Sequence, residues 1–249
     1  MTAFETVFIT GASAGIGAAL ARAYAAPGCT LGLVARRVEQ LERVKQELEG
    51  RGARVLLYQA DVRDAEQMAN AAKAFCSATE GVSLAIANAG TSHSDRLDQG
   101  SAAPGTETIA INVIGTINTL LPLVPAMMAQ RRGHLVAIGS VAGFRGLPHK
   151  GAYSASKAAV KTLLDGYRPV LRPYGIRCTT ICPGYVETEL TAKNKFPMPF
   201  LMPADRAARL IQGAINQGKS TYVFPWQMRA LIPLLQRVPD RWLPGNADL

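Results

Sequence analysis

The chain has little of what marks disulfide-stapled, metal-binding or membrane-spanning proteins. Its 249 residues include 4 cysteines and 3 histidines, none of them at the spacing of a metal site. No block of about five or six like charges occurs, and no apolar run approaches the ~18 residues of a membrane-spanning helix. These absences argue against a disulfide framework, a bound metal, a nucleic-acid-binding segment and a transmembrane anchor.

The cysteines and the first residues point to one compartment. Cys29, Cys76, Cys178 and Cys182 show no paired spacing of the metal type, so free and mostly buried thiols are expected. The start of the chain, Met1-Thr2-Ala3-Phe4-Glu5, lacks the basic residues and the apolar stretch of a signal peptide. We therefore expect a soluble protein of the reducing cytoplasm.

Length and charge limit the number of domains and the kind of ligand that the chain can have. Hydrophobic residues make up 48% of the chain, which is enough for the core of one large α/β domain. The formal net charge is +9, but the Lys and Arg residues are scattered along the chain. Scattered cations suit a small phosphate-bearing cofactor better than a nucleic acid.

Short apolar runs alternate with helical patterns along the chain. Strands are expected at 6–10, 30–35, 54–59, 84–88, 134–140, 177–182 and 221–224, and helices at 15–26, 38–48, 64–79, 104–131, 151–173 and 203–217. This order predicts a single doubly wound Rossmann-type α/β domain, 1–249, with a seven-stranded parallel sheet flanked by helices. Pro169 interrupts one helical pattern, at a cost of ~3 kcal/mol, so we expect a kink or an early helix end near Gly166-Tyr167-Arg168.

A glycine-rich segment joins the first strand to the first helix. It reads Thr10-Gly11-Ala12-Ser13-Ala14-Gly15-Ile16-Gly17, and its glycines allow backbone N–H groups to approach a pyrophosphate at a helix N-terminus. The second strand ends in Ala35-Arg36-Arg37, without the carboxylate that accepts the ribose hydroxyls of NAD. Two guanidiniums at this place suit a 2′-phosphate, so the sequence predicts NADP(H) in preference to NAD(H).

Tyr153 and Lys157 stand four residues apart, with Ser140 upstream. On a helix, such a pair shares one face. A neighbouring cation favours the phenolate and lowers the pKa of a tyrosine. The pair is therefore a candidate acid–base device for an alcohol or a carbonyl, although the same spacing occurs on many solvated helix faces.

With these motifs in place, the chain resembles the short-chain dehydrogenase/reductase family over about residues 6–188, and its topology extends the likeness to about 224. The segments that carry the resemblance are Thr10 to Gly17, Asp61-Val62, Asn88-Ala89-Gly90, Asn112, Ser140, Tyr153 with Lys157, and Pro183-Gly184 followed by Thr188. Ala87 departs from the family, because many members carry a further asparagine there.

The resemblance implies a role for each of these positions. Ser140 would hold the substrate oxygen, Tyr153 would exchange a proton with it, Lys157 would bond the nicotinamide ribose and lower the pKa of Tyr153, and Asn112 would anchor a water that extends the proton path. The implied cofactor contacts are Gly11, Ser13, Gly15, Ile16, Gly17, Arg36, Arg37, Asp61, Val62, Asn88, Ala89, Gly90, Tyr153, Lys157, Pro183, Gly184, Val186 and Thr188. Family members also use the helix expected at 151–173 as a subunit interface, which implies a homo-oligomer (dimer or tetramer).

Two segments lie outside the alternation. Residues 188–203 are rich in Pro, Met and Phe, which suggests either a lid over a hydrophobic or medium-sized carbonyl or alcohol substrate or simple packing on the body. The tail 225–249 combines apolar residues with arginines, as an interfacial membrane helix does. We favour packing for the tail, because Pro233 and Pro239 are expected to break its helix.

Three functions remain open on this sequence. The first is an NADP(H)-dependent oxidoreductase that transfers a hydride to or from a small-molecule carbonyl or alcohol, and the complete Ser–Tyr–Lys set favours it. The second is an NADP(H)-binding redox sensor or regulator without turnover, which has no need of all three residues. The third is a lyase or epimerase on the same scaffold.

Overall fold

Seven parallel strands form a single sheet in the order β3-β2-β1-β4-β5-β6-β7. The computed structural model describes residues 4–192, 194, 196–239 and 242. The strands are β1 (Thr6–Thr10), β2 (Thr30–Ala35), β3 (Arg54–Gln59), β4 (Leu84–Ala87), β5 (Gly133–Ile138), β6 (Ile176–Pro183) and β7 (Thr221–Phe224). The predicted seven-stranded parallel Rossmann-type sheet is confirmed.

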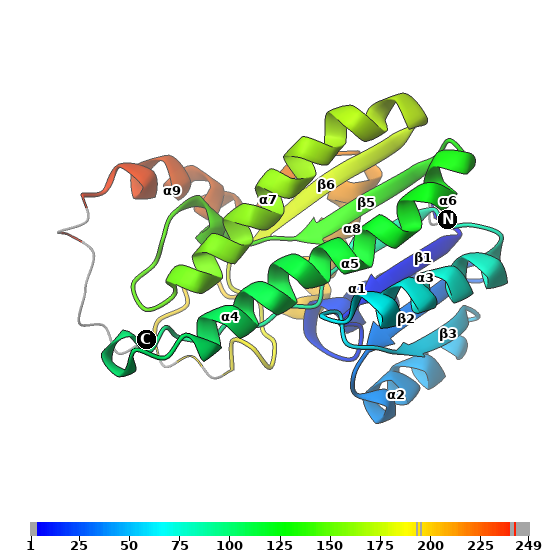
Figure 1. Ribbon diagram of the computed structural model, residues 1–249, viewed down its shortest axis with the longest axis horizontal. Helices are drawn as coiled ribbons and strands as arrows, with labels where there is room; N and C mark the ends of the chain where they lie inside the picture. Colours follow the sequence, from blue (N-terminus) through cyan, green and yellow to red (C-terminus); the bar gives the residue numbers. More distant parts are fainter. Residues whose placement is uncertain (1–3, 193, 195, 240–241, 243–249) are drawn as a thin grey trace.

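Helices cover both faces of this sheet (Figure 1). The helices are α1 (Gly15–Tyr24), α2 (Val38–Glu49), α3 (Ala65–Thr79), α4 (Ala103–Ile109), α5 (Gly115–Leu120), α6 (Val124–Ala129), α7 (Gly151–Leu171), α8 (Ala204–Asn216) and α9 (Trp226–Arg237). One layer is formed by α3 to α7, and the opposite layer by α1, α2 and α8. Helix α9 lies beyond the end of the sheet, against β7 and the turn at 141–144.

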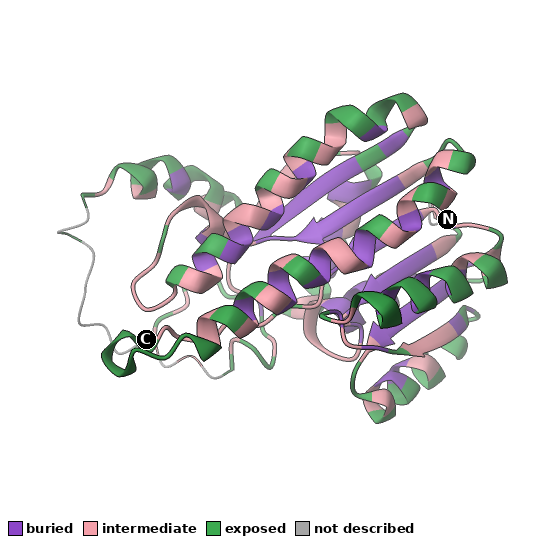
Figure 2. Cartoon of the chain, viewed as in Figure 1, coloured by how far each residue is buried: buried purple, intermediate pink, exposed green. Residues whose placement is uncertain are grey.

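Alternation along the strands produces two hydrophobic cores. Successive side chains of a strand point to opposite faces, so Val7 and Ile9 enter the core under α1 and α8, whereas Phe8 enters the core under α3 and α7. Figure 2 shows the central strands of the sheet buried between the two helical layers. Strands buried on both faces read as continuous apolar runs, which is why the sequence pattern locates them well.

The strand order reverses at β1, and this reversal places the site. Strand β1 pairs with β2 on one side and with β4 on the other. The connections that leave the carboxyl ends of these strands therefore diverge toward opposite faces of the sheet. In open α/β sheets, a crevice forms at such a switch point and binds ligands.

The long helical segment after β4 is not one regular helix. A π-helical turn at Ala110–Ile114 separates α4 from α5, and a 3₁₀ turn at Leu121–Leu123 separates α5 from α6. Within the stretch Ala103–Ala129, an 18-residue window has a mean hydropathy of 1.6, which meets the length and composition of a membrane-spanning helix. The expectation that no segment reaches this length is therefore wrong. A core helix passes the same test, and this one packs on β4, α3 and α7.

Both interior prolines lie within continuous helices, which contradicts the early end predicted before Pro169 and the break predicted at Pro233, whereas the kink predicted near Gly166-Tyr167-Arg168 stays a prediction. Helix α7 runs through Pro169 to Leu171, so the early end near Gly166 is wrong, and α9 runs through Pro233 to Arg237. Each proline removes one backbone bond close to the end of its helix, where tertiary contacts compensate. The buried Leu171 holds the end of α7, and the Leu235 carbonyl accepts a hydrogen bond from Arg145 Nη1 at 2.7 Å.

His134 on β5 makes the stability of the fold depend on pH. It is 1% exposed, and its Nε2 lies 2.7 Å from Thr179 Oγ1, whose own proton goes to the Lys219 carbonyl. Nε2 is therefore the donor, and Nδ1 has no hydrogen-bond partner among the described residues. Burial, with a smaller contribution from Arg177, holds the pKa of His134 down to about 4.

We expect the free energy of unfolding to fall by about 2 kcal/mol between pH 7 and pH 5 because of His134. The unfolded chain takes up a proton near pH ~6.5, whereas the folded chain does so only near pH 4. The stability is thus complete above pH ~6.5 and is lost as the pH falls toward 4. Urea unfolding of the wild type and of His134→Gln at both pH values measures this, and an equally steep decline in the variant would contradict it.

Candidate functional site

A cavity of about 520 Å³ opens at the carboxyl edge of the sheet. The loops that follow β1 to β6 supply its walls. The lining residues are Gly11, Ser13, Ala14, Gly15, Ile16, Ala35, Arg36, Arg37, Ala60, Asp61, Val62, Asn88, Ala89, Gly90, Thr91, His93, Glu107, Ile111, Ile138, Gly139, Ser140, Tyr153, Lys157, Pro183, Gly184, Val186, Thr188, Glu189, Leu190 and Thr191. Every site residue expected from the sequence is among them except Gly17 and Asn112, which lie behind the wall.

The glycine-rich segment Thr10 to Gly17, called the phosphate loop below, has a shape that only glycine permits at two of its positions. Gly11 has φ +64°, and a Cβ there would lie 2.8 Å from the Ala89 Cα. A Cβ on Gly17 would overlap the carbonyl oxygen of Gly11. The backbone of this turn is therefore free to approach a ligand at the start of α1, so the residues present fit a dinucleotide pyrophosphate.

Asn88 stiffens the phosphate loop from behind. Its Nδ2 donates to the carbonyl oxygens of Thr10 at 3.0 Å and Gly11 at 3.1 Å. The resemblance placed this residue beside the adenosine ribose, and it does line the cavity, but its amide nitrogen serves the loop. Ala87, where many family members carry a further asparagine, is buried in the core at the end of β4.

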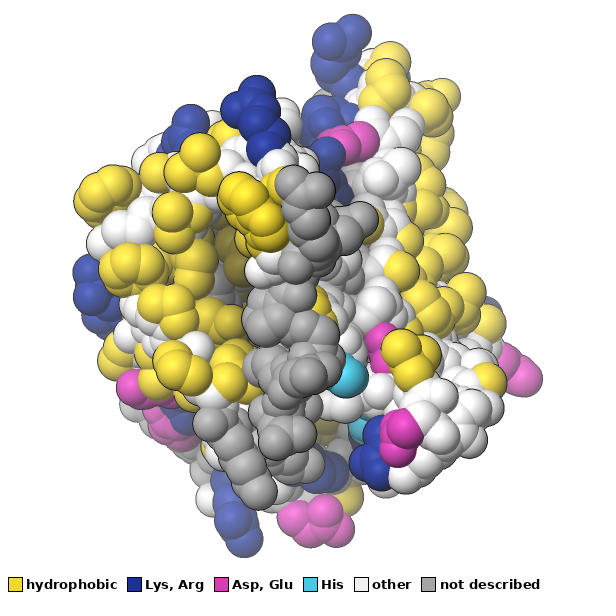
Figure 3. All heavy atoms as spheres, turned by 90° about the vertical axis from the view of Figure 1, so that its left-hand side faces the viewer, with side chains coloured by type: hydrophobic (Ala, Val, Ile, Leu, Met, Phe, Trp, Pro, Cys, Tyr) yellow, Lys and Arg dark blue, Asp and Glu magenta, His cyan; other side chains and the backbone are white. Residues whose placement is uncertain are grey.

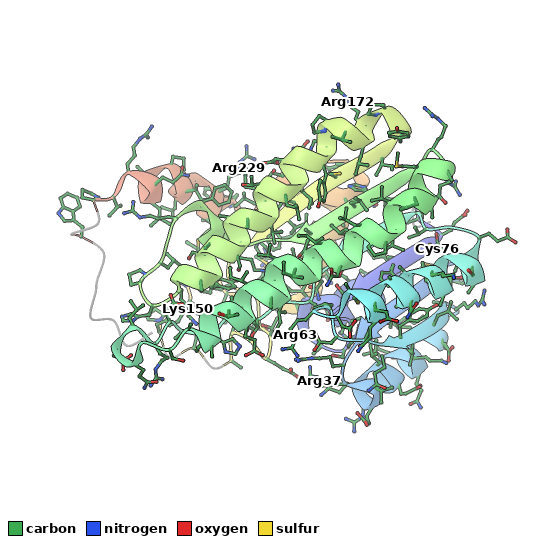
Figure 4. All side chains as sticks on the ribbon, viewed as in Figure 1. Arg37, Arg63, Cys76, Lys150, Arg172 and Arg229 are labelled. Carbon is green, nitrogen blue, oxygen red and sulfur yellow. The ribbon has the colours of Figure 1, made fainter. Side chains whose placement is uncertain are left out.

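Cations and carboxylates face one another at the end of the cavity beside β2. Arg37 Nη2 lies 2.9 Å from Glu189 Oε2, and Arg36 Nη1 lies 3.8 Å from Asp61 Oδ2. Arg63 holds the Asp61 carboxylate more closely, at 2.6 Å, and this hydrogen bond lowers the pKa of Asp61 against the effect of burial. Figure 4 shows Arg37 and Arg63 projecting from the same side of the sheet edge.

Ser140, Tyr153 and Lys157 meet at the opposite end of the cavity. Ser140 follows β5, and Tyr153 and Lys157 share one face of α7, as their spacing predicts. The Nζ of Lys157 donates to the Ile138 carbonyl at 2.9 Å and lies 5.8 Å from the centre of the Tyr153 ring. The structure thus brings together three residues from two elements, with the ammonium beneath the phenol.

Burial controls the protonation of this group. It lowers the pKa of Lys157 to about 8. It also raises the pKa of Tyr153, although a hydrogen bond with Ser140 acts in the opposite direction. The net shift of the Tyr153 pKa is upward, because desolvation outweighs the hydrogen bond with Ser140, so the lowered pKa that the sequence led us to expect beside Lys157 does not occur in the protein alone. At neutral pH, Tyr153 is a neutral phenol and Lys157 a charged ammonium.

Asn112, on the π-helical turn, forms hydrogen bonds with two elements that line the site. Its Oδ1 accepts from the Thr91 N–H at 2.8 Å, and its Nδ2 donates to the Thr91 carbonyl at 3.0 Å and to Ser156 Oγ at 2.9 Å. The side chain is 1% exposed. It joins the loop after β4 to α7, which carries Tyr153.

Several lining residues were missed in the sequence. Thr91 and His93 follow the Asn88-Ala89-Gly90 segment directly, and continuing past the strand end would have found them. Glu189 sits next to the expected contact Thr188. No local signal marks Glu107, which enters the cavity from α4 and bonds His93 Nε2 at 3.3 Å.

The family model described as "short chain dehydrogenase" matches residues 5–197 of the chain. An "uncharacterized oxidoreductase" of Myxococcus xanthus is 38% identical over 240 residues, which cover 95% of this chain and 94% of that protein. A similarly described oxidoreductase of Mycobacterium tuberculosis is 34% identical over 241 residues, covering 95% of each.

Solved structures resemble the whole fold. A short chain dehydrogenase/reductase of Burkholderia phymatum in complex with NAD has a TM-score of 0.86 at 27% identity, covering 94% of this chain and 96% of that chain. An alcohol dehydrogenase of Thermococcus sibiricus complexed with 5-hydroxy-NADP has a TM-score of 0.79 at 28% identity, covering 88% and 94%.

Proposed function

The chain belongs to the short-chain dehydrogenase family, and from that premise we propose that it transfers a hydride between NADP(H) and a carbonyl/alcohol pair. The observation that carries the proposal is the meeting of Ser140, Tyr153 and Lys157 in the cavity that also contains the phosphate loop. A regulator that only binds the cofactor has no use for the three together. The test is a panel of ketones, aldehydes and secondary alcohols, followed by NADPH or NADP absorbance, with turnover of at least one class expected.

Each of the three residues has one task in the proposed reaction. The bound dinucleotide would supply the hydride in the reducing direction. Ser140 donates a hydrogen bond to the substrate oxygen, and Tyr153, kept as a neutral phenol by burial, gives that oxygen its proton. Lys157 bonds the nicotinamide ribose, and its charge stabilises the phenolate that Tyr153 leaves behind.

We propose that segment 188–203 is a lid over the cavity, and its composition favours a hydrophobic or medium-sized substrate. Tyr185, directly after the cavity residue Gly184, packs edge-on against Phe196 with ring centres 6.0 Å apart. Leu190, Phe200 and Leu201 are exposed in the same segment 188–203. Figure 3 shows hydrophobic side chains gathered on the face that forms the left-hand side of Figure 1. Residues 193 and 195 of the lid lie outside the described part.

The NADP(H) preference rests on Arg36 and Arg37, which face the cavity without a ribose-binding carboxylate at the end of β2. Replacing both with alanine is expected to lower kcat/KM for NADPH by about 10- to 100-fold, because each charge-assisted bond to a phosphate is lost. The value for NADH is expected to stay nearly unchanged. Steady-state kinetics with both cofactors measures this, and equal efficiencies in the wild type would contradict the preference.

A second copy of the chain is the proposed protein partner. Ile109, Ile114 and Leu121 on the α4–α6 segment and Val170 on α7 are large apolar side chains that the fold leaves exposed. They lie in the layer where the family uses α7 as an interface. Burying them between copies would remove apolar surface from water, and light scattering of the purified protein tests the dimer or tetramer.

A further inference from the structure

We propose that the carboxylate of Glu189 occupies the position that the 2′-phosphate of NADP(H) takes on Arg37, and that it ties the lid to the phosphate loop until the cofactor displaces it. The inference deepens the proposed function and rests on its NADP(H) preference. It makes Glu189 a residue that sets affinity for the phosphorylated cofactor, although it belongs to the lid and not to the cofactor motifs.

Three separate parts of the chain meet at this ion pair. Arg37 follows β2, Ser13 lies in the phosphate loop, and Glu189 begins the lid. Arg37 Nη2 lies 2.9 Å from Glu189 Oε2 and 3.5 Å from Ser13 Oγ. An anion in this place is held by one guanidinium beside a hydroxyl, which is the donor set that a phosphate monoester requires.

The backbone that carries Glu189 is anchored. Thr191 Oγ1 donates to the Val186 carbonyl at 2.7 Å and accepts from the Thr188 N–H at 3.0 Å. A Cβ added to Gly15 would meet Thr188 Cγ2 at 3.0 Å, so this turn lies directly against the phosphate loop. The turn beside Glu189 is therefore packed on the phosphate loop, and the ion pair with Arg37 adds a second tie between the lid and this loop.

Arg36 has no carboxylate as close as the one that Arg37 contacts. It lies 3.8 Å from Asp61, whose carboxylate is already held by Arg63. A 2′-phosphate can engage Arg36 without displacing an anion from close contact, whereas at Arg37 Nη2 it meets the carboxylate of Glu189. Two anions on one guanidinium repel each other, so the carboxylate acts as a competitor for the phosphate.

The competition is expected to be modest because the pair is exposed. The side chains of Arg37 and Glu189 are 48% and 62% exposed. Exposed ion pairs are worth little in water, so removing the carboxylate is expected to tighten binding of a 2′-phosphate by about two- to fivefold. The gain disappears at high salt, where such pairs are screened.

The test compares Glu189→Gln with Glu187→Gln in the full-length protein. Glu187 is an exposed carboxylate two residues before Glu189 that does not line the cavity, so both variants change the net charge equally. Calorimetric titration at low salt with 2′,5′-ADP and with 5′-AMP gives the affinities. We expect Glu189→Gln to bind 2′,5′-ADP about two- to fivefold more tightly than Glu187→Gln does, with equal affinities for 5′-AMP.

Two outcomes overturn the inference. One is an equal affinity of the two variants for 2′,5′-ADP. The other is an equal gain of Glu189→Gln for both nucleotides, which would be a general charge effect. In an Arg37→Ala background, the Glu189→Gln gain is expected to vanish, because the competitor has then lost its partner.

The lid provides a readout independent of affinity. Saturating 2′,5′-ADP is expected to raise amide hydrogen exchange in residues 187–192 of the wild type, because the tether to Arg37 is broken. The same segment in Glu189→Gln is expected to exchange faster before any ligand is added. Unchanged exchange in both experiments argues that the ion pair does not tether the lid.

The same titrations distinguish a failure of the proposed NADP(H) preference from a failure of the role proposed for Glu189. If the wild type binds 2′,5′-ADP no better than 5′-AMP, the NADP(H) preference fails. If the wild type prefers 2′,5′-ADP and the two Gln variants behave alike, the preference stands and the role of Glu189 fails.

Discussion

Tyr153→Phe is expected to lower kcat/KM by about 10²- to 10⁴-fold, the usual size of a lost general acid–base group. The substitution removes only the phenol oxygen of a residue that lines the cavity with Ser140 and whose ring centre lies 5.8 Å from Lys157 Nζ. The ring keeps its packing on α7, so the melting temperature and the affinity for NADPH are expected to stay near those of the wild type. Steady-state kinetics and NADPH fluorescence titration measure the two effects separately.

A phenol elsewhere in the fold supplies the control. Tyr222 on β7 stacks on Phe224 and does not line the cavity, so Tyr222→Phe is expected to retain wild-type activity. If Tyr153→Phe keeps more than about a tenth of the activity, the proton comes from another group and the assigned acid–base role is wrong.

Lys157→Ala is expected to lower kcat/KM by about 10²-fold or more, and also to weaken NADPH binding, because one cation serves both the ribose and the phenolate. Tyr153→Phe affects the chemical step alone, so the two variants differ in their cofactor affinity. Cofactor titration together with single-turnover rates separates the two contributions.

The pH dependence of carbonyl reduction by the wild type is a second test of the role of Lys157. Burial lowers its pKa to about 8, so the ammonium form is complete well below pH 8 and declines as the pH rises through that value. Carbonyl reduction that needs the cation is expected to fall over the same range. The decline is expected to be absent from the residual rate of Lys157→Ala.

Lys161 is the matched control for Lys157. It stands one helical turn further along α7, where its Nζ pairs with Asp165 Oδ2 at 2.7 Å outside the cavity. Lys161→Ala removes the same charge from the same helix and is expected to leave kinetics and cofactor binding unchanged. An equal loss in both variants would assign the effect to α7 as a whole and not to the site.

The sheet was predictable because each strand carries its own signal. The apolar run Thr6–Thr10 ends in the structure where the pattern ends it, since strands buried on both faces have no polar alternation to blur their limits. The turn from β1 into α1 was predictable for a similar reason, because its positive φ values at Gly11 and Gly15 favour glycine.

The proline predictions failed because they weighed a local cost without its tertiary compensation. The rule for interior prolines counts one lost bond and one clash. The rule does not include tertiary contacts. Arg168, directly before Pro169, donates from Nε to the Cys178 carbonyl at 3.3 Å and from Nη1 to Asp165 at 3.0 Å. These contacts come from β6 and from the preceding turn, and they hold the last turn of α7 in place.

Residue types and spacing were sufficient to establish the alternating elements, the phosphate loop and the Tyr153–Lys157 pair, because each depends on neighbours within a few positions of the chain. The pairing of Arg37 with Glu189 across 152 positions and of Asn112 with Ser156 across 44 could not be read in this way. The net shift of the Tyr153 pKa also depends on burial, which no single segment specifies. Strand order and helix packing bring these groups together, and the low dielectric they create sets the protonation on which the proposed chemistry depends.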